Sequence, residues 1–137
     1  MSFGYGVGDF IAISTLALKV YSAYKDAPSD YGHISEEVVG LQVLIDKVEK
    51  HFKSSTISSN DRRDGLKVLK GCQSVLEDLN SLIEEYNSIA STNKRLVFKR
   101  VKLGTEDVAT LRARLISNTV LLSGFVRRFV ILATPIL

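Results

Sequence analysis

The residue types that most often carry chemistry are few in this chain and poorly spaced for it. Two histidines, His33 and His51, occur, and neither belongs to a His-x-x-x-His or Glu-x-x-His pair of the kind that holds a metal. Cys72 is the only cysteine, and a thiol needs an activating neighbour to become a nucleophile. A buried helix cysteine, a turn histidine and a histidine at a solvated helix end are the simpler interpretations. We therefore predict no catalytic residue, no metal site and no enzyme.

Acidic residues occur in adjacent pairs, and adjacent residues point to different faces of a helix rather than at one another. The pairs are Glu36/Glu37, Glu77/Asp78, Glu84/Glu85 and Glu106/Asp107. The motif Gly4-x-Gly6-x-Gly8 lacks the spacing of a phosphate-binding loop and the Gly-Lys-Ser/Thr that follows one. We expect no cofactor, and we interpret residues 1–8 as a flexible arm that presents Phe3, Tyr5 and Val7.

Positive charge gathers late in the chain, although the net charge is only +3. The basic excess peaks at five residues between Glu85 and Glu106, a stretch without acidic residues: Lys94, Arg95, Lys99, Arg100 and Lys102. A solvated loop, a phosphate contact and an anionic lipid surface all suit such a cluster. One short patch with little aromatic interleaving is weak ground for nucleic acid. We predict no nucleic-acid partner and keep contact with anionic lipid as the hypothesis.

The first 24 residues carry only two charges, Asp9 and Lys19. A helix over 9–26 is apolar nearly all round, which is typical of a helix enclosed by a bundle or suited to lipid. Its length of roughly 27 Å falls just short of the hydrocarbon core of about 30 Å. Lys19 at that depth would cost about 2.5–3.5 kcal/mol. Composition alone favours a central core helix. A permanent membrane anchor would not contain this lysine or precede a well-patterned helical bundle, whereas a helix that packs in the bundle and is later released is compatible with both features. The candidate core residues are Phe10, Ile11, Ile13, Leu16, Ala17, Val20, Tyr21 and Tyr24, with Ala12, Leu18 and Ala23 on other faces.

Helical spacing with start and stop signals predicts one all-α domain over residues 1–137, an antiparallel bundle of four to five helices. After Pro28 and a turn over 29–32, a second helix runs from Ser35 to about Phe52. A third runs from Asp61 to Ile89, with a kink considered at its two glycines, Gly65 and Gly71. A short basic helix over 91–103 precedes a last one from Thr105 to about Leu132.

The lone cysteine favours a reducing compartment, and the first residues do not make a good secretory signal. Ser2 stands where N-myristoylation needs glycine. The apolar ending FVILATPIL indicates an amino-terminal domain of a larger protein. We therefore expect a cytoplasmic protein at rest.

Three stretches resemble one known family in their order and spacing: MSFGYGVGDFIA, KDAPSDYGHISEEV and KLGTEDVATLRARLISNTVLLSGF. The chain is similar to the fungal HeLo-like domains that precede NACHT, ankyrin or other repeat modules. The likeness extends from Met1 to about Phe125. One departure is Phe98, in a basic stretch where many relatives carry tryptophan; this chain has no tryptophan.

The resemblance implies a helical bundle related to HeLo domains and to necroptosis-type executioners, with a role in programmed cell death or allorecognition. It also implies that the segment Met1–Tyr24 is exposed on oligomerisation and enters the plasma membrane. The expected partners are membrane lipids on activation, further copies of the chain, and a downstream NACHT, repeat or amyloid-motif module. The alternative is a non-lytic interaction or oligomerisation module of a fungal innate-immune-type receptor. The residues assigned to membrane insertion are Phe3, Tyr5, Val7, Phe10, Ile11, Ile13, Leu16, Leu18 and Val20.

Overall fold

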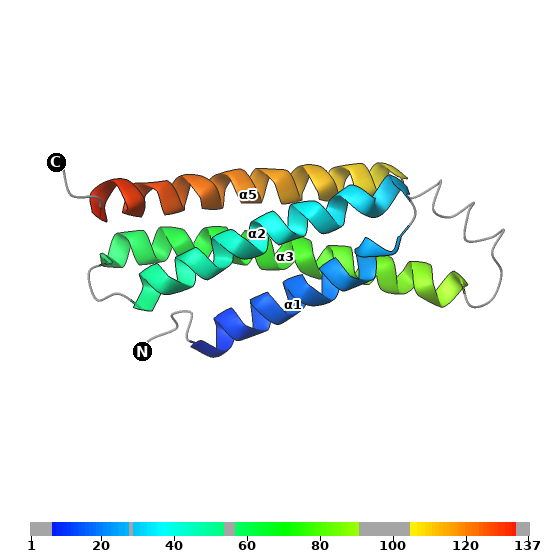
Figure 1. The fold of residues 1–137 in the computed structure, drawn as a ribbon, viewed down its shortest axis with the longest axis horizontal. Coiled ribbons are helices and arrows are strands. Elements are labelled where there is room, and N and C mark those ends of the chain that lie inside the picture. Colours follow the sequence, from blue (N-terminus) through cyan, green and yellow to red (C-terminus); the bar gives the residue numbers. More distant parts are fainter. Residues whose placement is uncertain (1–6, 28, 54–56, 91–104, 134–137) are drawn as a thin grey trace.

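The computed structural model describes residues 7–27, 29–53, 57–90 and 105–133, and these ranges hold four helices and no strand. The helices are α1 (Val7–Lys25), α2 (Ser29–Lys53), α3 (Ser59–Ala90) and α5 (Thr105–Ala133). In Figure 1, α1 and α3 run in one direction and α2 and α5 run in the opposite direction. The predicted all-α bundle is confirmed. The predicted helix over 91–103 lies outside the described residues.

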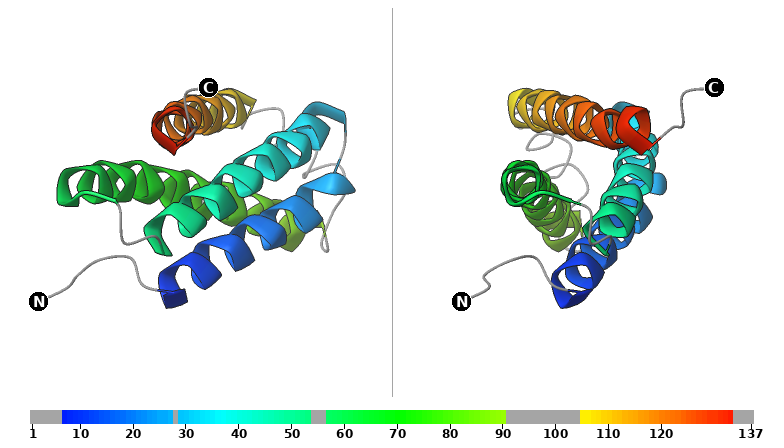
Figure 2. Two further views of the ribbon diagram at one scale, coloured as in Figure 1. Left: turned by 60° about the vertical axis from the view of Figure 1, so that its left-hand side comes forward. Right: turned by 90° about the vertical axis from the view of Figure 1, so that its left-hand side faces the viewer.

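The order of the helices around the bundle is α1, α2, α5, α3. α1 packs against α2 and α3, and α5 packs against the same two helices from the other side. No contact joins α1 to α5 in the described ranges, and the end-on view in Figure 2 places them at opposite edges. α2 and α5 therefore lie side by side and parallel, as do α1 and α3.

One cluster of buried apolar side chains, to which all four helices contribute, forms the core. On α1 the buried positions recur every three or four residues, which places them on one face of the helix. They are Phe10, Ile13, Ala17, Val20 and Tyr24. The periodicity of the last segment predicts a core stripe of Val108, Leu111, Leu115, Thr119, Leu122, Phe125 and Phe129. The buried residues on α5 are Val108, Leu115, Leu122, Phe125 and Val126, Leu111 is partly buried, and the side chain of Phe129 lies outside the described part of the chain.

Three predicted helix starts are wrong, those of α1, α2 and α3. Residues 29–32, predicted as a turn, belong to α2, so His33 is an exposed helix residue rather than a turn residue. Proline ends one helix but is well tolerated at the start of the next. A proline that predicts the end of the first helix is therefore also compatible with a second helix that begins directly after it. α1 begins at Val7, two residues inside the predicted arm, and Asp9 lies in the first turn, where a carboxylate is favoured by the helix dipole.

α3 also begins earlier than predicted, at Ser59 instead of Asp61. Ser58 caps this end, because its hydroxyl oxygen accepts the backbone N–H of Asp61 at 3.1 Å. The backbone carbonyl of Ser58 accepts the N–H of Arg62 at 2.9 Å. The cap lies about one turn before Asp61, the charged residue at which the sequence predicted the helix to begin.

The two glycines of α3 are places of close approach, and α3 is one continuous helix across both. A Cβ at Gly65 would lie 2.7 Å from Cζ of Phe125 and 3.0 Å from the ring of Phe52. A Cβ at Gly71 would lie 2.5 Å from Oδ1 of Asn118. Glycine at these positions allows α5 to lie directly on α3.

We expect Gly65→Ala to lower the free energy of unfolding by about 1–3 kcal/mol, because the new methyl group overpacks two phenylalanine rings. The matched control is Gly124→Ala on exposed α5 backbone, where a Cβ meets nothing within 4 Å. That change should raise stability by about 0.5–1 kcal/mol. Urea unfolding followed by circular dichroism measures both. Equal effects of the two substitutions would contradict the packing at Gly65.

Candidate functional site

The residues assigned to membrane insertion divide between two faces of α1. Phe10, Ile13 and Val20 are buried, and Leu16 is partly buried. Ile11 and Leu18 are 59% and 54% exposed. Phe3, Tyr5 and the side chain of Val7 lie outside the described part of the chain. α1 is thus an edge helix rather than the central core helix that composition favoured, and the expectation that Ile11 faces the core is wrong.

The solvent face of α1 carries one charge, Lys19, between Asp9 and Lys25. Ile11, Thr15, Leu18 and Ser22 recur every three or four residues and are all exposed, so they form one uncharged line on the side away from the core. A surface helix normally turns a charged face to water. α1 instead combines an apolar core face with an outer face that has a single charge.

Lys19 is the one charged residue between Phe10 and Tyr24, and it lies at the flank of the uncharged line. Its Nζ is 3.3 Å from Oε1 of Glu84 on α3, and both side chains are exposed. The same Oε1 accepts the side-chain N–H of Asn80 at 3.2 Å. An exposed pair of this kind contributes about 0–1 kcal/mol, so it holds α1 weakly.

Specific contacts anchor α1 near both ends. The Tyr24 hydroxyl donates a buried hydrogen bond of 2.7 Å to the carbonyl of Leu79 on α3. Near the other end, Phe10 meets Phe52 of α2 edge to face, with ring centroids 5.4 Å apart. Arg62 stacks over the Phe52 ring at 4.9 Å and donates to the Phe52 carbonyl at 3.0 Å. Between these ends, α1 is held by buried aliphatic side chains and by the exposed Lys19–Glu84 pair.

Withdrawal of α1 from the bundle would expose four large side chains: Phe10, Ile13, Val20 and Tyr24. At about 1.5–3 kcal/mol for each, the cost is about 6–12 kcal/mol. The whole stability of a domain is about 5–15 kcal/mol. α1 can therefore leave the bundle only when another apolar environment receives it.

The remaining candidates for chemistry are inert in this structure. Cys72 is fully buried, and desolvation by that burial raises the pKa of its thiol to about 12, so it stays protonated at neutral pH. Among the described residues, no group of histidine, cysteine and carboxylate side chains is arranged to hold a metal.

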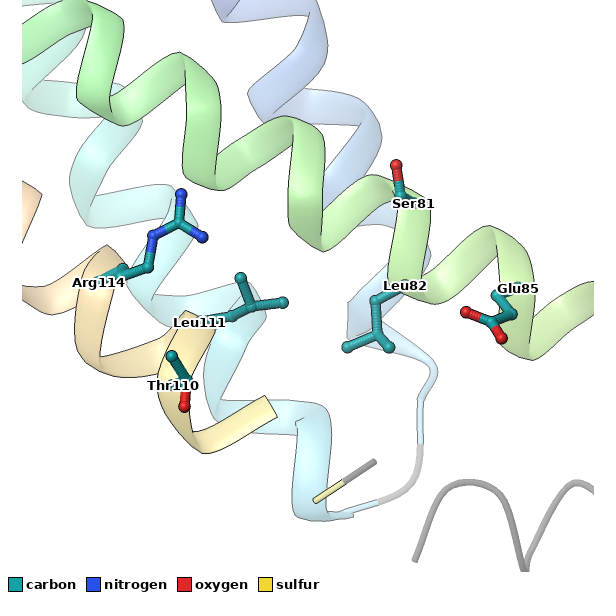
Figure 3. A pocket seen from close by; sticks show the side chains of 6 residues that line it. All are labelled: Ser81, Leu82, Glu85, Thr110, Leu111 and Arg114. Carbon is teal, nitrogen blue, oxygen red and sulfur yellow. The ribbon is translucent and has the colours of Figure 1, made fainter. Parts of the chain in front are cut away.

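A shallow hollow lies between α3 and α5. Figure 3 shows Leu82 and Leu111 facing one another across it, with Arg114 beside them. Arg114 is already engaged, because its guanidinium lies 2.7 Å from a carboxylate oxygen of Asp78. The hollow is apolar at its centre, and the polar side chains of Ser81, Glu85 and Thr110 also line it.

The predicted lipid-contact residues Lys94, Arg95, Lys99, Arg100 and Lys102 all lie outside the described residues, so their role stays a prediction.

Exposed apolar residues on α2 and α5 were missed from the sequence. Val39, Val43, Ile116, Val120 and Leu121 are all between 42% and 63% exposed. The signal was present, because Ile116, Val120 and Leu121 fall outside the core stripe of their own helix. The predictions for these two helices concerned only the residues that face the core, so the exposed apolar residues were not singled out.

No helix in the described ranges is both long enough and apolar enough to cross a membrane. Comparison of the chain with protein families, with curated proteins and with solved structures finds no match.

Substitutions on the two faces of α1 should differ sharply. Leu18→Glu should change the free energy of unfolding by no more than about 0.5 kcal/mol, because the site faces water. Ile13→Ala should lower it by about 2–5 kcal/mol, because it leaves a cavity in the core. Thermal and urea unfolding of both variants provides the measurement. A large loss for Leu18→Glu would show that this side of α1 is covered.

The Cys72 thiol should resist alkylation by iodoacetamide at pH 7.5 in the folded protein and react rapidly in denaturing urea, because only the thiolate is nucleophilic. Its folded pKa of about 12 exceeds the ordinary thiol value of 9.0. The folded state then binds more protons than the unfolded state between these values, so this group makes stability fall as pH rises through that window. Mass spectrometry after timed quenching measures the modification. Rapid labelling under native conditions would contradict the burial of the thiol.

Proposed function

We propose that this chain is a non-enzymatic cell-death or allorecognition effector domain that oligomerises and permeabilises membranes through its amino-terminal helix. The observation that carries the proposal is the uncharged line Ile11–Thr15–Leu18–Ser22 on the outer side of α1, a helix whose other face is apolar. The resemblance to HeLo-like domains supports the biological role. The domain rests in the cytoplasm and acts at the plasma membrane.

The energies of the two locations of α1 are close in this scheme. Phe10, Ile13 and Val20 exchange a protein interior for hydrocarbon and stay buried. Ile11 and Leu18, now more than half exposed, would add part of the about 1.5–3 kcal/mol that full burial of such a side chain provides. Lys19 opposes insertion by about 2.5–3.5 kcal/mol unless its amine reaches the interface. The difference is small enough for clustering of copies to decide it.

The edge position of α1 supports release without complete unfolding. α5 keeps its own contacts with α2 and α3 when α1 leaves, because α1 and α5 share none. Departure of α1 would uncover the apolar surface that it now covers on α2 and α3. That surface favours association of neighbouring copies, which is the step that a downstream NACHT, repeat or amyloid-motif module would drive.

The basic cluster over 94–102 has a role in the same scheme. Each lysine or arginine near an anionic membrane surface contributes about 1 kcal/mol of attraction. We propose that this cluster lies against lipid headgroups and so brings α1 to the bilayer.

A non-lytic interaction module is the second candidate, and the anchored ends of α1 favour it. The Tyr24 hydrogen bond and the Phe10–Phe52 contact are what a permanent core helix would carry. In that case α1 never leaves the bundle, and the domain acts only by docking onto other copies or other proteins.

Dye leakage from vesicles distinguishes the two candidates. The chain is fused to an inducible oligomerisation tag and added to vesicles with and without anionic phosphatidylserine. Leakage that requires both the inducer and anionic lipid supports the effector function. Intact vesicles after induced clustering would leave the non-lytic module as the function.

Leu18→Glu and Ile11→Glu should each reduce leakage by roughly tenfold or more, because a carboxylate in hydrocarbon costs about 2.5–3.5 kcal/mol, while folding is retained. Val39→Glu on α2 is the matched control, since Val39 is also an exposed apolar residue but lies on a helix that stays outside the bilayer. Stopped-flow dye release gives the rates. Equal losses in the control and in the two α1 variants would contradict insertion of α1.

A further inference from the structure

An uncharged surface extends across the boundary between α2 and α5, which pack side by side. A bidentate ion pair marks this boundary: Nε and Nη2 of Arg112 lie 2.9 and 2.7 Å from Oε1 of Glu37. One turn further along each helix, Gly40 and Ile116 are both exposed. Another turn on, Val43 and Val120 are exposed as well. We call these four residues, together with Ala113, the seam face.

The seam face is open and neutral. A Cβ at Gly40 would meet nothing within 4 Å. Val43, Ile116 and Val120 are between 45% and 63% exposed. The charge of Arg112, next to Ala113 in the chain, is engaged by Glu37, which also raises the pKa of the guanidinium through its hydrogen bond and its charge. Single exposed apolar residues need no explanation, but a contiguous group of them marks an interaction site.

Charge of opposite sign flanks the neutral centre. On α2 an exposed line runs Glu36–Gly40–Val43–Lys47, with steps of four, three and four residues that keep one helix face. This line is acidic at its beginning, neutral in the middle and basic at its end. On α5 the exposed Arg127 lies beyond Val120. Since α2 and α5 are parallel (Figure 1), Lys47 and Arg127 both lie toward the carboxyl ends of the two helices.

A surface with this order of charges is complementary to itself when turned end for end. A two-fold axis that crosses the helices at the level of Ile116 brings α2 against α2 of a second copy in the antiparallel sense. Glu36 of each copy then faces Lys47 of the other, and the neutral centres meet. A parallel arrangement would instead bring the basic ends together. Two-fold pairing of identical patches is also the commonest form of protein oligomer.

We propose that the seam face binds the same face of a second copy of this chain, in an antiparallel dimer. The biological role of this dimer rests on the proposed function, because it would be the contact through which resting or clustered copies recognise one another. The neutral patch is short, so the interface lies near the small end of specific interfaces, at about 1,200 Å² of total buried area. We expect a dimer that forms reversibly in the micromolar range.

Charge exchange tests the arrangement directly. Sedimentation equilibrium of the chain at low salt, over a concentration series, gives the dimer dissociation constant. Glu36→Lys and Lys47→Glu should each weaken the dimer by about five- to tenfold, since each places like charges together twice across the axis. The double variant Glu36→Lys/Lys47→Glu restores both opposite-charge pairs and should return to within about twofold of the unaltered chain. A double variant as weak as the single ones would overturn the proposal.

Substitutions in the neutral centre provide the second arm. Ile116→Glu should abolish the dimer, and Leu18→Glu on α1 is the matched control that should leave it intact. Circular dichroism verifies that both variants fold. A chain that stays monomeric throughout the concentration series would refute the dimer. Equal loss of association in Ile116→Glu and Leu18→Glu would assign the contact to another surface.

The dimer and the membrane activity can fail separately. If Ile116→Glu stays monomeric but leaks vesicles once the tag clusters it, the seam face is the recognition surface and α1 the lytic element. If the dimer is absent yet induced clusters of the unaltered chain leak vesicles, only the seam-face proposal falls. If the dimer forms as described and clusters never leak, only the lytic function falls.

Discussion

The packing of one apolar face of α1 against α2 and α3 is the contact on which the architecture depends. It closes the core on one side and provides most of the contact that holds α1 in the folded domain, because the Lys19–Glu84 ion pair between α1 and α3 is exposed and weak. Hydrophobic contact is non-directional and is available in any apolar medium. The same side chains that fix α1 in the bundle would therefore be satisfied in a lipid environment.

Helix identity was predictable from the sequence because start and stop signals bound the segments and because apolar residues recur with helical spacing in α2, α3 and α5. The core stripe of α5 and the burial of Cys72 followed from the same signal. Helix starts were less predictable: Ser58 and the residues after Pro28 act through local hydrogen bonds and backbone angles that leave little trace in composition. The line of exposed residues on α1 was predictable only in part: Leu18 was placed outside the core face, whereas Ile11 was assigned to the core, since an apolar helix gives little sign of which apolar side faces water.

The order of the helices around the bundle depends on tertiary contacts that no single segment encodes. Gly65 and Gly71 looked like weak points in a long helix, and they proved to be contact points for Phe125 and Asn118. Ion pairs between distant helices, such as Arg112 with Glu37 and Arg128 with Asp61, fix the register of α5 against its neighbours. Such pairs join residues more than sixty positions apart in the chain. Because the sequence has many acidic and basic residues, charge alone does not predict which of them pair.

The separation of α1 from α5 has an evolutionary consequence. Changes on the outer surface of α5 and changes on the outer surface of α1 act through residues that share no contact, so their energetic effects should be independent. Substitutions can then accumulate on one edge of the domain without an energetic effect on the residues of the opposite edge.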